Sequence, residues 1–159
     1  LAEAAAIHER KESLMGCAYG SEARGTFTKS EVIIDEKRIY FPEVLQPDYV
    51  IALHQVAYNR YVKTLGKETC LLYDSDTVKA EESDAKQLGI PFTSISDQAG
   101  AANGQNMVAL GVLAGALGIV GKEALDTLIA EKFASKPNVV ERNQTAISLG
   151  MEAGKNLAL

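Results

Sequence analysis

The chain has 159 residues, of which 47% are hydrophobic and 23% are charged, and its formal net charge is -5. These values predict one globular domain with a sizeable core, and they argue against nucleic acid or an anionic membrane surface as the main partner. The longest apolar run, residues 107–120, is too short and too rich in glycine to span a bilayer, so we expect no membrane insertion.

The first part of the chain predicts a helix tail followed by two strands. Residues 1–11 are typical of the end of a helix, and residues 14–18 form a short apolar strand. Residues 27–34 are rich in β-branched residues and predict a second strand, which residues 37–41 extend as a hairpin arm or a loop. A connector containing two prolines follows.

The middle of the chain has the pattern of a strand–helix–strand unit. Residues 49–53 and 69–73 are continuous apolar runs typical of buried parallel strands. Residues 55–65 between them have helical spacing and end at a glycine, so the three elements predict a right-handed parallel unit. Beyond them we expect a short helix at residues 81–88 and an edge strand at residues 91–95.

The last third predicts three helices. Residues 103–118 are apolar nearly all round but contain four glycines, each of which costs about 1 kcal/mol relative to alanine in a helix interior. We therefore expect another backbone to approach this helix closely. Residues 122–133 form an amphipathic helix, and a last helix begins at Pro137 with Ser135 as its cap.

Together these elements predict an α/β fold: a three-layer α/β/α Rossmann-like domain with a mainly parallel sheet and a helical C-terminal part.

Two cysteines, Cys17 and Cys70, lie far apart and belong to no metal-ligand or redox motif. They suit a reducing cytoplasm, and the apolar start of the chain lacks the basic flank of a signal peptide, so we expect a cytoplasmic protein. Both thiols are expected to be buried, and two thiols cannot supply the four ligands of an iron–sulfur cluster.

The most specific pattern lies between the first two predicted strands. Tyr19-Gly20 permits a sharp turn, and Glu22, Arg24 and Gly25 fill a polar loop. Arginine offers a planar fork of donors and glycine lets backbone N–H groups approach closely, so this loop is a candidate anion site. The alternative is a surface ion pair of the arginine with a neighbouring glutamate.

This segment resembles the signature of the gamma subunit, or gamma domain, of 2-oxoacid:ferredoxin oxidoreductases, Tyr-Gly-Pro-Glu-(Ser/Ala)-Arg-Gly-Gly-x-(Ser/Thr)-(Lys/Arg)-Ser-Glu-Val. Ser21 replaces the usual proline and Thr26 the usual second glycine, which loosens the inferred turn geometry. The matching residues are Tyr19, Gly20, Glu22, Ala23, Arg24, Gly25, Thr28, Lys29, Ser30, Glu31 and Val32. Shorter matches continue to residue 143, and the motif looks closer to 2-oxoglutarate enzymes than to pyruvate enzymes.

The resemblance implies a non-autonomous subunit of an enzyme that converts 2-oxoglutarate to succinyl-CoA and CO2 and reduces ferredoxin. It implies alpha, beta and iron–sulfur partner subunits that hold thiamine diphosphate, magnesium and the iron–sulfur cluster, with coenzyme A as co-substrate. None of these groups is expected to bind to this chain alone. A homodimer is a candidate form of the isolated chain. Members of the family begin with a strand and a Gly-rich turn, so residues 1–159 are expected to be a single gamma domain without that segment.

The resemblance also implies a share in coenzyme A binding or in a loop at a partner's site. The candidate residues are Tyr19, Gly20, Glu22, Arg24, Gly25, Thr28, Lys29, Ser30 and Asn106. Asn106 lies in the first turn of the apolar helix, so we expect it to bond to a neighbouring loop or subunit, with Asn103 as the cap of that helix.

Polar residues also follow the two predicted parallel strands. His54 is a ligand candidate or, as we favour, an ordinary helix-start residue, and Gln55 and Tyr58 are expected to orient a loop or an interface. The Asp-Ser-Asp run at residues 74–76 could hold a divalent ion or a ribose, but we favour its interpretation as a helix-capping turn.

No nucleophile–base constellation is apparent in the sequence. Two alternative functions remain: a stand-alone Rossmann-like nucleotide-binding module, and a purely structural subunit without ligand contacts. The glycines of the last helices favour subunit packing over the stand-alone module.

Overall fold

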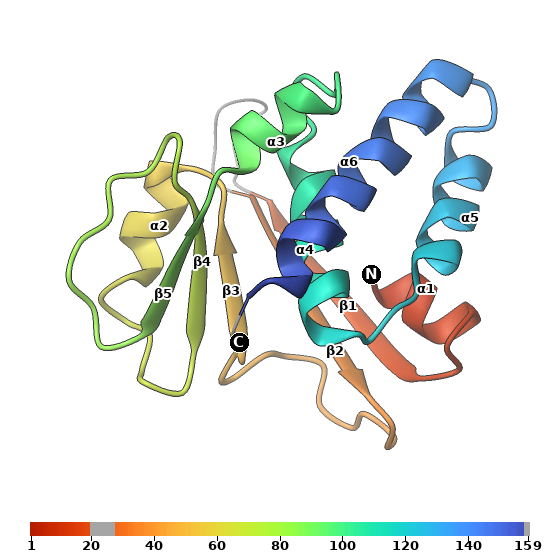
Figure 1. Cartoon of the computed structure of the whole chain (residues 1–159). Coiled ribbons are helices and arrows are strands. Elements are labelled where there is room, and N and C mark those ends of the chain that lie inside the picture. The colour runs from red at the N-terminus through yellow and green to blue at the C-terminus, as the bar shows by residue number, and fades with distance from the viewer. Residues whose placement is uncertain (20–27, 158–159) are drawn as a thin grey trace.

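The computed structural model describes residues 1–19 and 28–157, with a two-stranded antiparallel hairpin beside a three-stranded parallel sheet (Figure 1). The elements in chain order are α1 (Ala2–Ile7), β1 (Glu12–Tyr19), β2 (Thr28–Asp35), β3 (Tyr49–Ala52), α2 (Gln55–Tyr61), β4 (Cys70–Asp74), β5 (Lys86–Ile90), α3 (Phe92–Gln98), α4 (Gln105–Leu117), α5 (Lys122–Lys132) and α6 (Pro137–Lys155).

The hairpin pairs β1 with β2 in one continuous register, from Glu12 opposite Asp35 to Tyr19 opposite Thr28. Its two predicted strands are confirmed. Helix α1 packs against it, and the Ser13 hydroxyl donates a hydrogen bond of 2.7 Å to the Ala2 carbonyl. The hairpin is therefore held mainly by its own ladder and by one short helix.

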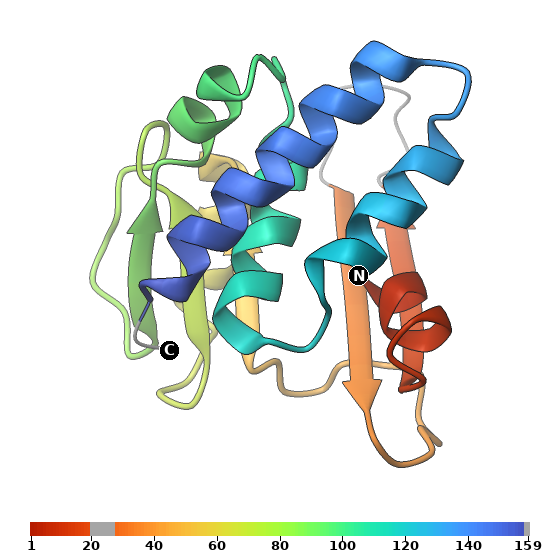
Figure 2. The ribbon, with the colours of Figure 1, turned by 45° about the vertical axis from the view of Figure 1, so that its right-hand side comes forward.

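The parallel sheet has the order β3-β4-β5 and separates two helical layers (Figures 1 and 2). The side chains of successive residues in the central strand β4 point to opposite faces of the sheet, because side chains alternate along a strand. Leu71 packs with Tyr58 and Val62 on the α2 side, whereas Leu72 packs with Phe92 and the apolar residues of α4 and α6. The predicted three-layer α/β/α architecture is thus confirmed, although the antiparallel hairpin stands outside the parallel sheet.

The expectations for residues 81–88 and 91–95 were wrong. Residues 86–90 form strand β5, which pairs in parallel with β4, and residues 92–98 form helix α3. Pairing along the open edge of β4 outweighed the weak helical pattern, because strand formation is decided by available ladder partners. Pro91 ends the strand instead of starting one, since proline cannot donate to a ladder.

The glycines of the apolar helix α4 lie where α6 crosses it (Figure 2). A Cβ atom added to Gly111 would come within 3.0 Å of the Ile147 backbone, and one on Gly150 would come within 3.1 Å of the Val108 backbone. The expected close approach of another backbone is confirmed. The approaching backbone belongs to this same chain, so these glycines give no support to subunit packing.

Two predicted helix caps were wrong. Helix α4 begins after Gly104, not Asn103, whose φ is +62°, and the Ser96 hydroxyl accepts the Gly104 N–H at 3.0 Å. Helix α6 begins after Lys136 without a side-chain cap, so Ser135 plays no such role, although Pro137 occupies the first turn as expected. Caps depend on backbone angles that residue type only biases.

Across residues 1–19 and 28–157, none of the helices combines the length and the apolar character needed to cross a membrane.

Candidate functional site

The hairpin end that carries the sequence motif is framed by Tyr19, the last residue of β1, and Thr28, the first residue of β2. Gly20, Glu22, Arg24 and Gly25 lie outside the described residues. The structure therefore shows where the motif enters and leaves the hairpin, and it describes three of its candidate side chains, those of Thr28, Lys29 and Ser30.

Lys29 is held by a neighbour on its own strand. Its Nζ donates a hydrogen bond of 2.7 Å to Oε1 of Glu31, and both side chains are about one-third exposed. This hydrogen bond is the main cause that raises the pKa of Lys29 above its usual range, so the group is charged at neutral pH. Glu31 thus pairs with Lys29, which weakens the alternative that Arg24 uses Glu31 as its surface partner.

Thr28 and Ser30 are exposed and alternate with the pair formed by Lys29 and Glu31. The Ser30 hydroxyl lies 3.7 Å from the Cys17 thiol across the strand pair. Cys17 is exposed, contrary to expectation. It shares a face of β1 with Ser13, which is bonded to α1, but it lies four residues nearer the motif end of the hairpin. Cys70 is buried as expected, and burial raises the pKa of its thiol.

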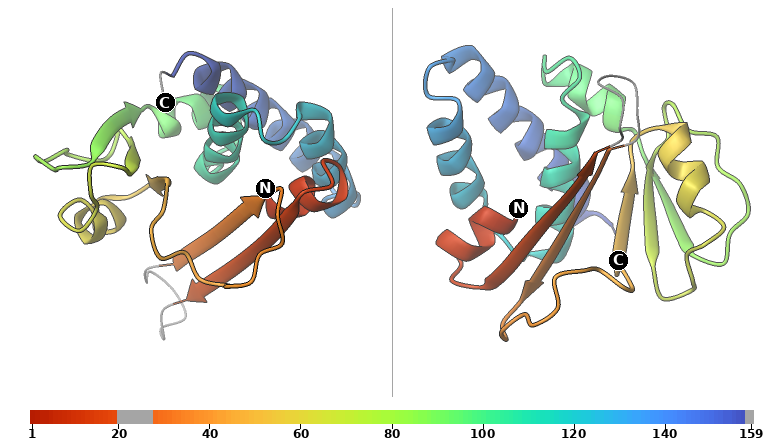
Figure 3. Two further views of the ribbon diagram at one scale, coloured as in Figure 1. Left: turned by 90° about the horizontal axis from the view of Figure 1, so that it is seen from below. Right: turned by 180° about the vertical axis from the view of Figure 1, so that it is seen from behind.

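The motif end of the hairpin lies at the same end of the molecule as the carboxyl ends of the parallel strands and the start of α4 (Figures 1 and 3). Ligands of open α/β sheets commonly bind at this edge, since loops and helix starts converge there. The fold thus places the end of β1 and the start of β2 at the end of the molecule where such a ligand is expected.

His54 caps helix α2 at this edge. Its Nδ1 accepts the N–H of Val56 at 3.3 Å, so the favoured interpretation as a helix-start residue is confirmed. Gln55 bonds in both directions with the backbone of Lys79, at 3.2 and 2.7 Å. It therefore orients the loop that precedes β5, one of the two roles expected for it.

Tyr58 is fully buried and holds the same loop. Its hydroxyl accepts the Glu81 N–H at 2.8 Å and donates to Oε1 of Gln87 at 2.5 Å. The phenol also stands edge-on to the ring of Tyr73, with centroids 5.5 Å apart. Tyr58 is a structural anchor beneath this edge of the sheet.

The first prediction concerns that hydroxyl. Tyr58→Phe is expected to lower the free energy of unfolding by about 1–2 kcal/mol, because it removes the hydrogen bonds that the phenol makes with the Glu81 N–H and with Oε1 of Gln87. Urea titration followed by circular dichroism measures it. Tyr40→Phe, at a ring that is 87% exposed, is the comparison variant, and an equal loss in both would contradict the anchor role.

The run at residues 74–76 forms a capping turn, as favoured. The fully buried Asp74 carboxylate accepts the Thr93 hydroxyl at 2.6 Å, the Thr77 hydroxyl at 2.9 Å and the Thr93 N–H at 3.3 Å. Asp76 accepts the N–H of Ser94 at 2.7 Å. These donors tie β4 to the start of α3, a role that the sequence pattern alone did not reveal.

Asn106 is exposed, and its Oδ1 accepts the N–H of Met107 at 3.0 Å. The structure describes no bond from Asn106 to another loop of the chain, so a bond to another subunit stays a prediction. Within residues 1–19 and 28–157, no three His, Cys, Asp or Glu side chains are grouped to hold a metal ion.

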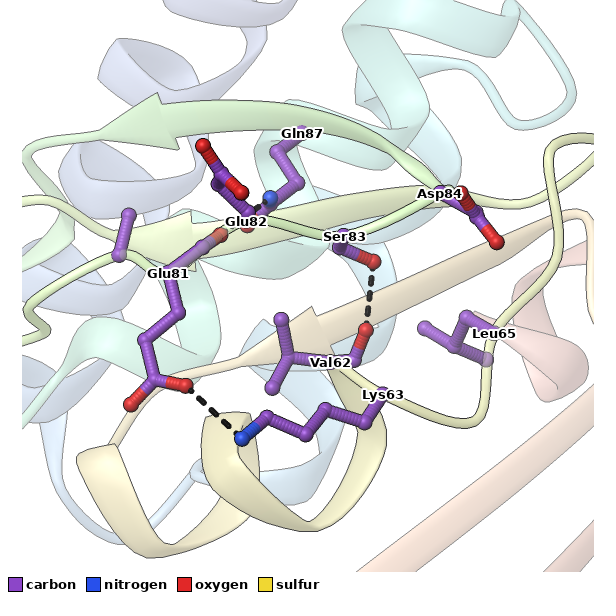
Figure 4. A pocket seen from close by; sticks show the side chains of 9 residues that line it. Val62, Lys63, Leu65, Glu81, Glu82, Ser83, Asp84 and Gln87 are labelled. Atoms are coloured by element: carbon purple, nitrogen blue, oxygen red, sulfur yellow. Dashed lines mark hydrogen bonds and ion pairs between the residues drawn. The ribbon is translucent and has the colours of Figure 1, made fainter.

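An open recess of about 850 Å³ lies between the end of α2 and the loop before β5 (Figure 4). Lys63 forms an ion pair of 3.4 Å with Glu81, and the Ser83 hydroxyl donates to the Val62 carbonyl at 2.5 Å. Its lining residues include none of the candidates from the sequence motif, and these polar groups bind one another. We therefore place the candidate site at the hairpin end and not in this recess.

The family model described as pyruvate ferredoxin/flavodoxin oxidoreductase matches residues 1–153. The 2-oxoglutarate synthase subunit KorC of Methanocaldococcus jannaschii is 37% identical over 99% of this chain and 85% of its own length. The ketoisovalerate oxidoreductase subunit VorA of Methanothermobacter thermautotrophicus is 32% identical over 93% of this chain but only 31% of its own length.

Two solved structures share the fold. The keto/oxoacid ferredoxin oxidoreductase gamma subunit of Geobacter sulfurreducens has a TM-score of 0.78 and 32% identity over 98% of this chain and 88% of that chain. The 2-oxoglutarate:ferredoxin oxidoreductase of Magnetococcus marinus, solved with 2-oxoglutarate, coenzyme A and succinyl-CoA bound, has a TM-score of 0.79 and 22% identity over 99% of this chain and 28% of that chain. The chain belongs to the pyruvate ferredoxin/flavodoxin oxidoreductase family, as its motif had indicated.

Proposed function

We propose that this chain is the gamma subunit of a cytoplasmic 2-oxoglutarate:ferredoxin oxidoreductase. The complex combines 2-oxoglutarate with coenzyme A, releases CO2 and succinyl-CoA, and transfers two electrons to ferredoxin. The observation that carries the proposal is the 37% identity to a 2-oxoglutarate synthase subunit along 99% of the chain. The gamma-subunit structure with the same fold supports the assignment to that subunit.

Thiamine diphosphate, magnesium and the iron–sulfur cluster belong, in this proposal, to alpha, beta and iron–sulfur partner subunits. The described residues do not fit a cluster, because Cys17 lies exposed on the hairpin and Cys70 is buried in the parallel sheet. A cluster needs four thiolates converging on one point. The chain's own contribution is therefore binding and assembly, and we assign it no bond-making step.

We further propose that the hairpin end contributes to the coenzyme A site. The phosphates of coenzyme A are matched by the guanidinium of Arg24 and, more weakly, by Lys29, whose charge Glu31 partly neutralises. The position of this end beside the carboxyl edge of the parallel sheet supports the proposal. Its effect is to bind and orient coenzyme A for reaction at a site held by partner subunits.

Purification of the complex from its native cell through a tag on this chain tests the assembly. We expect thiamine-dependent subunits to co-purify, with dye reduction that requires both 2-oxoglutarate and coenzyme A. Dye reduction with pyruvate and not 2-oxoglutarate would contradict the substrate. A chain that came down alone and inert would contradict the complex and make nucleotide binding the next test.

The second prediction concerns Arg24. Arg24→Gln in the assembled enzyme is expected to raise the KM for coenzyme A about tenfold with little change in kcat, because it removes binding that ground and transition states share. Initial-rate kinetics with coenzyme A as the varied substrate measure it. Arg142→Gln, on the exposed side of α6, is the control. An unchanged KM would favour the purely structural subunit.

A further inference from the structure

The face of the hairpin that carries Lys29 is open on one side. Ala18 lies directly opposite Lys29 in the ladder. Gly16 lies opposite Glu31, and residues that face each other in an antiparallel pair project to the same side of the sheet. Ala18 is exposed, and among the described residues a Cβ added to Gly16 would meet only Oε2 of Glu31, at 4.0 Å. The two charged side chains of β2 therefore stand beside a strip of small residues on β1.

Lys29 and Glu31 hold each other along the edge of this strip. Nζ of Lys29 donates to Oε1 of Glu31 at 2.7 Å, and the two side chains are 35% and 31% exposed. The hydrogen bond with Glu31 is the main cause that raises the pKa of Lys29, and the positive charge of Arg60 in the last turn of α2 lowers it to a smaller extent. Lys29 thus has a second cation within electrostatic reach.

A phosphate group is a stronger partner for Lys29 than the carboxylate of Glu31. An ion pair with this exposure contributes little to stability, because water competes for both charges. A phosphate group carries about two negative charges and has three acceptor oxygens, whereas a carboxylate carries one charge on two oxygens. A phosphate that reaches Lys29 therefore displaces the carboxylate, but the displaced negative charge remains nearby and repels it.

From these observations we infer that Glu31 competes with coenzyme A for Lys29. A phosphate group of coenzyme A approaches over Gly16 and Ala18 and replaces the Glu31 carboxylate as the partner of the ammonium. Glu31 thereby lowers the affinity for coenzyme A and for the product thioester, which carries the same phosphates. This inference rests on the proposed function, because the ligand is the coenzyme A of that reaction.

The substitution Glu31→Gln in the assembled complex tests the competition. It keeps the shape of the side chain and one acceptor oxygen but removes the negative charge. We expect the KM for coenzyme A to fall about three- to tenfold and the KM for 2-oxoglutarate to stay unchanged. Glu12→Gln, at the exposed far end of the same hairpin, is the matched control and should change neither constant. An unchanged or higher KM for coenzyme A in Glu31→Gln would overturn the inference.

A double-variant cycle shows whether Glu31 acts through Lys29. In a Lys29→Gln background there is no ammonium to compete for, so Glu31→Gln should change the KM for coenzyme A by less than about twofold. A gain of the same size in both backgrounds would contradict the competition. If the wild-type complex requires coenzyme A and Glu31→Gln behaves like the wild type, the competition is wrong while the proposed function stands. If the wild-type complex needs no coenzyme A, both are wrong.

The route over the small residues has its own test. Ala18→Leu places a larger side chain beside Lys29 and should raise the KM for coenzyme A about tenfold. Ala130→Leu, on the exposed side of α5, makes the same change away from the hairpin and should leave this KM unchanged. Circular dichroism should show that all variants are folded. An unchanged KM in a folded Ala18→Leu variant would overturn the route.

Discussion

Gly111→Ala is expected to lower the free energy of unfolding by about 2 kcal/mol, one of the two largest single-site effects that the structure predicts. An alanine Cβ at this position would come within 3.0 Å of the Ile147 carbonyl carbon and its Cα, and backbone cannot move aside as the end of a side chain can. Overpacking of this kind costs typically 1–3 kcal/mol or more, which exceeds the gain of about 1 kcal/mol in helix propensity. A fall in the free energy of unfolding would therefore show that overpacking against α6 outweighs the gain in helix propensity, and a rise would show the opposite.

Thermal unfolding followed by circular dichroism measures this change. For a domain of this size the loss corresponds to a fall in Tm of roughly 4–8 °C. Gly66→Ala is the matched control, because a Cβ there meets no atom within 4 Å, and its Tm should stay within about 1–2 °C of the wild type. A Gly111→Ala variant with an unchanged or higher Tm would show that α4 and α6 do not approach so closely.

Asp74→Ala is expected to lower the free energy of unfolding by about 3 kcal/mol. The fully buried carboxylate accepts hydrogen bonds from two hydroxyls and two backbone N–H groups, of Asp76, Thr77 and Thr93. Hydrogen bonds to charged groups contribute about 1.5–3 kcal/mol, and donors left buried without a partner add their desolvation cost. The loss should loosen the start of α3 first.

Urea unfolding gives the free energy, and hydrogen exchange at the first amides of α3 shows where the structure loosens. Asp74→Asn keeps the shape and one acceptor, so it should lose about half as much. Asp84→Ala removes an exposed carboxylate from the loop before β5 and should change stability by less than about 0.5 kcal/mol. Equal losses at positions 74 and 84 would mean that the effect is one of net charge.

Much of the fold could be predicted from local pattern. The apolar runs at residues 49–53 and 69–73 and the helical spacing between them predicted β3, α2 and β4, because periodicity reports burial directly. The hairpin and the last three helices were predicted for the same reason. The strand expected ahead of residue 1 stays a prediction.

The errors lie where distant residues decide. Residues 86–90 became a strand because the edge of β4 was open to pairing, and residues 92–98 became a helix whose first turn is bonded by Asp74. The role of Asn103 was misjudged because the Gly104 N–H is bonded by the Ala101 carbonyl at 2.7 Å and by the hydroxyl of Ser96, eight residues away, at 3.0 Å, and Gly104 therefore takes the cap position. Such partners do not appear in any local window of sequence.

The candidate site was identified by motif. The run from Tyr19 to Val32 indicated the family before any geometry, and the family match over residues 1–153 confirmed it. No side-chain arrangement was needed for that step, because the motif is an ordered set of residue types. The roles of Arg24 and Asn106 in ligand binding stay predictions.

The sequence by itself determined the family, the α/β class and the need for a close backbone contact at the glycine-rich helix. Only the tertiary structure decided which backbone makes that contact, which is the backbone of α6 in the same chain. A glycine in a helix indicates that another backbone approaches closely, but it does not indicate which segment that backbone belongs to. That identity depends on how the chain folds back on itself, since two helices meet only after the loops between them have set their direction.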